Sequence, residues 1–485
     1  MLYCSPLMRL FLTILILFAN YACGFAQTIT IQGKNDTVPN TRAALQLPEQ
    51  VTLRSIHIYG NKITRRSIIL REMSVKEGDV LVSDSIDHIL DINHKRLFNQ
   101  GLFTDINLYI DKIDDSGVNL IVRVKERWYW FPEVSFQLAD RNFNVWWTEQ
   151  NRDIRRANIR LTVKDRNFRG NMESLAATVQ VGYTQKFALD YSRPYIDRKQ
   201  RHGIGGSVSF AKNEETFYTT DSNKLKFVRT PRSYIYRQFE AGLSYTYRPD
   251  YAVRHLIELR YRDAEMNDTL LTLNRDYYLN GSRYLRYMQL LYRLEMNKVD
   301  NWNYPLTGCK LVTHAVFRQG IEGMQYQAFL QGEYGWFKKL GKSKFYVSEI
   351  ARGRVTGPER NQPYVLRYAM GNESEYLRGY EYYVIDGSHY GLLRSNLKYE
   401  LLHVNVKDLP FKYLPSIPLR VYPKVFVDVG YVHNRFPFNS YLNNKPLYSA
   451  GFGIDIVSAY DMKIRIEYAF NHLGEKGLFL HLNGE

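Results

Sequence analysis

Most of the chain alternates apolar and polar residues with a period of two, the pattern of β-strands that have two different faces. From Ala157 to Lys164 the odd positions are apolar and the even ones are polar or charged. The segments 257–262, 393–401 and 463–468 repeat this alternation. About sixteen such segments follow one another from Tyr129 to Leu482, with no convincing helix between them. The pattern predicts one large antiparallel β-structure with an even number of strands.

A shorter part with a different pattern precedes these strands. Residues 55–61 alternate and stop at Gly60-Asn61, a turn signal that ends a strand. Two segments with helical spacing follow, opening near Thr64 and Ser83, and the second ends at Gly101. Two further alternating segments lie at 103–110 and 118–124. The order strand, helix, helix, strand, strand predicts a small domain with a three-stranded sheet over residues 51–127.

A soluble β-sandwich would also alternate, with its apolar face inward. Many strands, however, carry several full charges on their polar face, and the strands are too numerous for one sandwich core. A transmembrane barrel with a lipid-facing exterior and a polar interior fits better. The composition agrees, because aromatic residues make up 14% of the chain and 39 of them are tyrosines, while mean hydropathy is negative. We therefore predict an outer-membrane β-barrel over residues 128–485.

The connections between the strands differ in length. Those at 165–171, 248–252 and 458–460 are short, whereas those at 212–235, 264–283 and 355–391 are long. Short periplasmic turns and long external loops are typical of such barrels. An even strand number then places both barrel ends, and with them the small domain, in the periplasm. The segment of about 355–391 becomes the sixth external loop.

The N-terminus has the features of an export signal. Met8-Arg9 precedes an apolar run over 10–18, and the small residues Gly24 and Ala26 suit a cleavage site before Gln27. We expect a signal peptide over 1–26, with either Met1 or Met8 as the start, and a polar linker over 27–50. A lipid-anchored Cys23 is the alternative, but the residue three places before it is not aliphatic.

After cleavage only Cys309 remains, so an intrachain disulfide is impossible. The net charge of +16 is spread along the chain rather than gathered in one patch, which argues against a nucleic-acid partner. A charged barrel interior and contacts with anionic lipid head groups account for it better.

Several motifs fall in the order and spacing of one known family. The small domain resembles a POTRA domain at Gly60-Asn61, Gly78-Asp79, Gly101-Leu102-Phe103 and 122–126. Four parts of the barrel also resemble motifs of this family. They are 167–170 with 191–195, Asp300 with Pro305 and Gly308, Leu377-Arg378-Gly379-Tyr380 in the sixth external loop, and 426–430. The chain thus resembles the superfamily of outer-membrane assembly and translocation proteins that includes BamA, TamA and FhaC, also called the bacterial surface antigen family.

The resemblance implies a loop that folds into the barrel, where Arg378 pairs with Asp428, Gly379 permits the bend and Tyr380 packs on the wall. The alternation agrees, since Val425, Val427 and Val429 would face lipid and Asp428 the lumen. The alternative is that Arg378 is an ordinary exposed arginine of a surface loop and Asp428 an ordinary charge of the lumen.

The resemblance also implies a function. The chain would insert or translocate other proteins in the bacterial outer membrane, binding extended or unfolded protein substrates by strand addition to the POTRA sheet. Its other partners would be outer-membrane lipids and accessory assembly proteins. The barrel would be monomeric. A single POTRA domain points to a specialised member of the superfamily. The chain ends in Asn483-Gly484-Glu485 rather than on the aromatic residue common in that family.

Two other function classes fit the sequence less well. A solute channel would explain a charged lumen, but it has no use for a POTRA domain. An enzyme is disfavoured because the eleven histidines are scattered and no catalytic or metal-binding pattern emerges, so we expect no cofactor and no metal. The identity of the substrate does not follow from the sequence.

Overall fold

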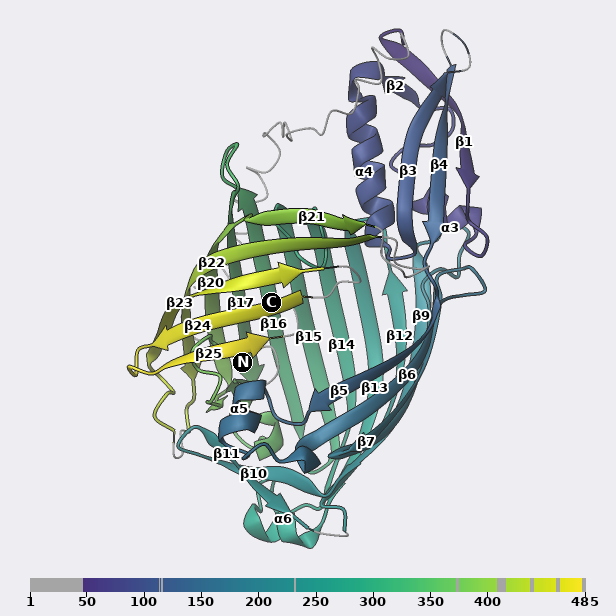
Figure 1. The fold of residues 1–485 in the computed structure, drawn as a ribbon. Helices are drawn as coiled ribbons and strands as arrows, with labels where there is room; N and C mark the ends of the chain where they lie inside the picture. Colours follow the sequence, from purple (N-terminus) through teal and green to yellow (C-terminus); the bar gives the residue numbers. More distant parts are fainter. Residues whose placement is uncertain are drawn as a thin grey trace, which may run out of the picture.

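A computed structural model describes residues 47–112, 114, 117–230, 233–371, 375–407, 416–436, 440–458 and 463–481. The expected signal peptide and most of the expected linker lie outside these ranges. A small N-terminal domain stands at one end of a large barrel, and the long connections gather at the other end (Figure 1). Within the described part of the chain, no helix is long and apolar enough to cross a membrane.

The N-terminal domain contains four strands and two α-helices. In chain order they are β1 (Gln50–Tyr59), α3 (Arg66–Glu72), β2 (Val80–Val82), the 3-10 turn η1 (Ser83–Ser85), α4 (Ile86–Asn99), β3 (Phe103–Lys112) and β4 (Gly117–Glu126). The sheet order is β2-β1-β4-β3, and β1 pairs with β4 in parallel. The predicted three-stranded sheet was therefore wrong by one strand, because the three residues of β2 are too few to show a period.

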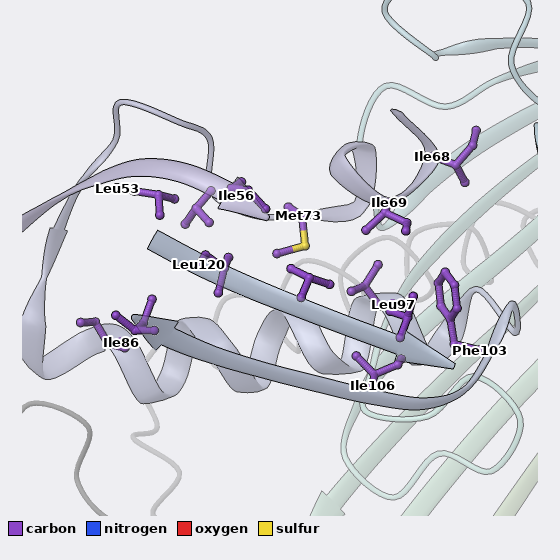
Figure 2. Packing of buried hydrophobic residues seen from close by; sticks show 14 of the residues in the cluster. Leu53, Ile56, Ile68, Ile69, Met73, Ile86, Leu97, Phe103, Ile106 and Leu120 are labelled. Carbon is purple, nitrogen blue, oxygen red and sulfur yellow. The ribbon is translucent and has the colours of Figure 1, made fainter. Parts of the chain in front are cut away.

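The core of this domain lies between the sheet and the two helices. Leu53 and Ile56 of β1, Leu120 of β4 and Ile106 of β3 pack against Ile69 of α3 and against α4 (Figure 2). All are at most 5% exposed. Their alternation in the strands and helical spacing in α3 and α4 place them on facing surfaces, and burial of apolar area stabilises the domain.

The barrel is closed and built from consecutive antiparallel strands. Its segments are β5 (Trp130–Leu138), β6 (Ala157–Phe168), β7 (Glu173–Gly182), β8 (Thr184–Arg193), β9 (His202–Asn213), β12 (Tyr236–Tyr247), β13 (Val253–Met266), β14 (Tyr284–Val299), β15 (Gly308–Glu322), β16 (Tyr326–Lys339), β17 (Phe345–Gly357), β20 (His389–Tyr399), β21 (Leu402–Lys407), β22 (Ser416–His433), β23 (Pro446–Val457), β24 (Lys463–Asn471) and β25 (Lys476–His481). Of these seventeen segments, β20 and β21 both pair with β22 and form two parts of one strand. The barrel thus has the sixteen strand positions that the alternation predicts.

The two faces of the barrel wall differ as the alternation requires. Val425, Val427 and Val429 are about half exposed on the outside. Phe426 and Asp428, the residues between them, are 3% and 0% exposed on the inside. An apolar exterior around a polar interior is the reverse of a soluble sandwich and is typical of membrane barrels.

The long connections contain structure that the periodicity did not reveal. They hold the helices α5 (Phe143–Thr148) and α6 (Asp268–Leu273), the 3-10 turns η2 (Ile154–Arg156) and η3 (Tyr364–Leu366), the hairpin β10 (Glu215–Asp221) with β11 (Lys224–Arg229), and the short pair β18 (Tyr368–Met370) with β19 (Ile385–Asp386). The expectation of no helix after the small domain was therefore wrong. Six-residue helices have fewer than two turns and leave no recognisable period in the sequence.

The N-terminal domain is fixed to the barrel by a buried ion pair. Glu72 of α3, 1% exposed, accepts two hydrogen bonds from Arg248 in the turn between β12 and β13, at 2.7 Å and 2.9 Å. The same guanidinium donates to the Tyr195 hydroxyl at 2.6 Å. Near the end of β6, the Asn167 amide donates to the Thr64 hydroxyl at 2.9 Å. The end of β6 and the turns after β8 and β12 therefore hold the small domain in place.

Candidate functional site

The connection between β17 and β20 folds back into the barrel. Its segment Leu377-Arg378-Gly379-Tyr380 lies against the inner wall, and every side chain in it is at most 2% exposed. A turn with a hydrogen bond from the Tyr380 amide to the Leu377 carbonyl, 3.0 Å long, shapes the tip. The segment packs with a cluster that includes Met370, Tyr390 and Leu447.

Arg378 is fully buried and its polar contacts come from three strands. Its Nε donates to Asp428 Oδ2 at 2.8 Å, and its Nη2 contacts the other oxygen of the same carboxylate. Its Nη1 donates to Asn396 Oδ1 at 2.6 Å and lies 3.3 Å from Glu467 Oε1. The guanidinium also covers the Phe426 ring, 3.9 Å from its centroid. Bidentate pairing of this kind requires the planar guanidinium of arginine.

A second layer of charges surrounds this pair on the inner wall. Lys424 Nζ lies 2.7 Å from Glu467 Oε1 and 2.6 Å from Asp455 Oδ1. Arg394 Nε lies 3.8 Å from Asp428. Buried charges are tolerated only when they are paired, and each carboxylate of this network has a cationic partner within 4 Å.

Gly379 occupies a left-handed conformation, with φ of +83°. A Cβ atom built there would approach the Cβ atoms of Ala469, Asn471 and Ser449 at 3.4–3.5 Å. The Gly379 carbonyl accepts a hydrogen bond from Asn471 Nδ2 at 2.8 Å. Glycine therefore permits the bend with little conformational cost, and the loop backbone is tied to β24.

Tyr380 is 2% exposed and its ring packs among the loop and wall residues. Its hydroxyl donates to the Tyr448 carbonyl on β23 at 3.1 Å and also contacts His472 Nδ1. A buried tyrosine is stable where its hydroxyl finds such partners.

The residues flanking the motif reach the last strand. The Tyr376 ring stacks on His481 of β25, with centroids 5.0 Å apart, and Glu381 Oε1 lies 3.6 Å from His481 Nε2. Burial raises the pKa of Glu381, and the neighbouring imidazole opposes this rise. The loop thus bridges the wall at β22 to the strand that ends the barrel.

The first external loop, the connection 139–156 between β5 and β6, contacts the inserted loop from the other side. Arg141 donates to the carbonyls of Gly371, Tyr383 and Tyr382 at 2.9, 2.8 and 3.2 Å. Asn142 Nδ2 donates to the Glu381 carbonyl at 2.8 Å, and Asn144 Nδ2 of α5 donates to the Leu478 carbonyl of β25 at 2.6 Å. In the strand order β25 stands beside β5, so this loop contacts both the inserted loop and the seam between the first and last strands.

The predicted POTRA motif residues occupy turns and core positions of the N-terminal domain. Gly60, Gly78 and Gly101 all have positive φ, and a Cβ at Gly60 would lie 2.0 Å from the Val124 carbonyl oxygen. The other three also have structural contacts: the Asn61 amide donates to the Thr64 carbonyl at 3.0 Å, the Asp79 carboxylate accepts from the Lys76 amide at 2.8 Å, and Phe103 is 1% exposed. They therefore stabilise the turns and the core of the domain.

Sequence reasoning missed several residues of the site. Glu467, Asn396 and Lys424 have inward positions that strand alternation indicates, but nothing in the sequence says which inward residues share a height in the barrel. Arg141 and Asn142 lie in a loop without a recognised motif. Only the register of the closed wall and the path of the loops bring these residues together.

The comparisons with known proteins agree with this architecture. A family model described as POTRA, surface antigen variable number repeat, matches residues 51–127, and one described as the Omp85 superfamily domain matches residues 167–477. Over 75 residues the chain is 35% identical to "Outer membrane protein assembly factor BamA" of Neorickettsia risticii (strain Illinois), which is 16% of this chain and a tenth of that relative.

Two solved structures cover most of the chain. CdiB from Escherichia coli is 12% identical, covers 89% of this chain and 75% of its own, and has a TM-score of 0.52. BamA from Haemophilus ducreyi lacking POTRA domains 1-3 is 16% identical, covers 89% and 83% respectively, and has a TM-score of 0.48. At 12% identity the likeness to CdiB concerns the fold. Because the Omp85 model matches well over half of the chain, the protein belongs to the Omp85 superfamily, with one POTRA domain in the described residues followed by the barrel.

Proposed function

We propose that this protein inserts or translocates other proteins in the bacterial outer membrane, with the POTRA domain in the periplasm and without enzymatic chemistry. Assembly or translocation of proteins is the activity that the superfamily and its BamA and CdiB members indicate. The observation that carries the proposal is the fully buried Arg378 contact with Asp428, Asn396 and Glu467. It supports a loop that acts as a latch on the barrel wall.

In this proposal the edge strands of the POTRA sheet bind the substrate. In the order β2-β1-β4-β3, the outer strands are β2, with three residues, and β3, with ten. An outer strand offers unpaired backbone groups to which an extended chain can add as a further strand. The length of β3 favours it, since more hydrogen bonds can form along it.

The docked POTRA domain would deliver the substrate at a constant place. The Glu72–Arg248 pair and the Asn167–Thr64 hydrogen bond join the domain to the barrel turns. A captured strand would therefore meet the barrel in one orientation, and the short β25 beside β5 is the natural place for the wall to open.

The proposal can be tested with the purified full-length protein in liposomes, using an unfolded outer-membrane barrel protein of known fold as the probe. We expect faster appearance of protease-resistant folded probe than in empty liposomes, and loss of the gain with Arg378→Ala. If wild-type protein does not accelerate insertion of the probe, and a secreted polypeptide is not protected inside the vesicles either, the proposed function is wrong.

A second experiment addresses strand addition. A photo-crosslinking residue at Asn107 on β3 should trap the probe, whereas one at Asp91 on the outer surface of α4 should not, because a helix offers no free backbone edge. Equal trapping at both positions would argue against binding at the sheet edge.

A further inference from the structure

One acidic side chain points outward from the middle of the barrel wall. In β17 the neighbours of Glu349 face the lumen: Ser348 and Ile350 are 2% exposed, and Ser348 accepts a hydrogen bond from Asn396, itself a partner of Arg378. Because side chains alternate along a strand, Glu349 faces outward. On the adjacent strands it lies opposite Trp336 and Ser395.

Glu349 lies far from both ends of its strand. It is four residues after Phe345, which packs on Tyr399 with ring centroids 4.9 Å apart, as in an aromatic girdle. It is six residues before Val355, the outward residue near the other end. Other outward charges, such as Lys212, Arg286 and Lys338, stand next to strand ends, where they can reach water or head groups. Glu349 has no such route.

The carboxylate of Glu349 is only partly satisfied. The Ser395 hydroxyl donates to its Oε2 at 2.5 Å. Among the described residues, no cationic group lies within ion-pair distance of it. A carboxylate on the lipid side of a barrel is unfavourable and needs a partner, so such residues point to functional contacts.

The surface next to Glu349 has little side-chain bulk. The next outward residues of β17 are Ala351 and Gly353, and Gly353 lies opposite Gly332 on β16 and Gly391 on β20. Their outward direction follows from Arg352 and Glu333, which point inward and pair at 2.6 Å. Small residues permit close backbone approach between membrane-embedded segments.

We propose that the outward face of β16, β17 and β20 around Glu349 and Ser395 binds a membrane-embedded segment of another protein that carries a lysine or arginine at the height of Glu349. The outward carboxylate supplies the complementary charge, and the three aligned glycines supply the surface for close packing. The site faces lipid and shares no residue with the latch, so it does not depend on the insertion activity.

Charge complementarity argues against a second copy of this chain as the occupant. The outward basic residue nearest to it in register is Lys338 of β16, which lies opposite Val347 and so stands nearer the strand end than Glu349, and a symmetric contact would bring two carboxylates together. A lipid ammonium group is also a poor match, because head groups stay at the interface rather than at mid-bilayer depth.

The test is photo-crosslinking in intact cells with the full-length protein. A crosslinker at Leu393, on β20 next to Ser395 and 44% exposed, is compared with one at Leu259, the same residue type on β13 and 47% exposed. From Leu393 we expect one adduct whose crosslinked peptide, identified by mass spectrometry, contains a lysine or arginine within an apolar run. Its yield should fall at least tenfold with Glu349→Gln, while Leu259 yields lipid adducts only.

A charge exchange completes the test. Glu349→Lys should abolish the adduct, and replacing the partner's basic residue by glutamate should restore it. The folded barrel, followed by its heat-dependent mobility in detergent gels, should be unchanged in Glu349→Gln, which separates this contact from a folding defect. Lipid adducts alone at Leu393, a covalent dimer of this chain, or an adduct insensitive to Glu349→Gln would each overturn the proposal.

Discussion

Arg378 carries a full charge in a place with no access to water, and its environment explains why lysine would not replace it. Its guanidinium serves one carboxylate with two nitrogens, an amide with a third, and stacks on Phe426. An ammonium group carries its three donors on one nitrogen, so it cannot match the two oxygens of a carboxylate side by side and stack on a ring at the same time. The site therefore depends on the shape of the cation as well as on its charge.

Replacing Arg378 by alanine should destabilise the inserted loop by about 3–5 kcal/mol, because Asp428 and Glu467 would be left as buried and less well-paired anions. The measurement is the temperature at which the folded barrel loses its compact gel mobility. Arg378→Lys should recover only part of the loss. Arg435→Ala, at a 61% exposed position of an external loop, is the control and should have no measurable effect. Equal effects at the two positions would contradict the latch.

Substitutions of Gly379 can distinguish the cost of backbone strain from the cost of side-chain crowding. Gly379→Ala should cost about 1 kcal/mol, since φ is positive but the new Cβ would have contacts of 3.4 Å or more. Gly474→Ala is the matched control, because its φ is +78° and no atom lies within 4 Å of the added Cβ. Similar losses in gel-shift temperature are expected for the two variants. Gly379→Val should cost much more, as its branches would meet Ala469 and Ser449.

At the scale of the elements, the first external loop acts as a clamp. Arg141 binds three carbonyls of the inserted loop, and α5 contacts β25 through Asn144. A single external loop therefore contacts both the inserted loop and the strand that closes the barrel.

Arg141→Ala should loosen the inserted loop without unfolding the barrel, because the Arg378 contacts remain. We expect faster proteolysis within 375–388 in intact cells, with an unchanged gel-shift temperature of the barrel. Arg155→Ala, in the same loop and 68% exposed, should leave the proteolysis rate unchanged. Equal rates for wild type and Arg141→Ala would show that the clamp does not hold the loop.

At the scale of the whole molecule, the POTRA domain and barrel form a joined unit. The buried Glu72–Arg248 pair links α3 to a barrel turn, with Tyr195 as a third partner. Removing either partner should widen the distance distribution between spin labels at Asp91 and Lys342. In a double-mutant cycle of Glu72→Gln and Arg248→Met, the interaction free energy between the two residues should be on the order of 2 kcal/mol.

The control for this prediction is an exposed ion pair within the small domain. Arg54 and Asp114 lie 2.7 Å apart but are about half exposed, so Asp114→Asn should leave the label distances unchanged. Unaltered distances in Glu72→Gln would mean that other contacts hold the domain.

The arrangement of the loops at the end of the barrel also leads to a prediction about ion conductance. The hairpin between β10 and β11 reaches the sixth loop, where the Val384 amide donates to the Asn223 carbonyl at 2.8 Å, and Asn223 is fully buried. Wild-type protein in planar bilayers should therefore conduct weakly, and replacing residues 375–386 by a short Gly-Ser linker should raise the conductance several-fold. High conductance of the wild type would favour the solute-channel alternative.

The sequence by itself determined the alternation, and with it the barrel, the inward direction of Asp428 and the positions of the POTRA turns. Each of these follows from local periodicity or from a residue type that a turn requires. Tertiary structure alone decided the short strand β2 and the loop helices, which are too brief to leave a period. It also decided the further partners of Arg378, Asn396 and Glu467, and the outward position of Glu349 beside three aligned glycines. These depend on strand register and loop path, which arise from contacts between residues far apart in the chain.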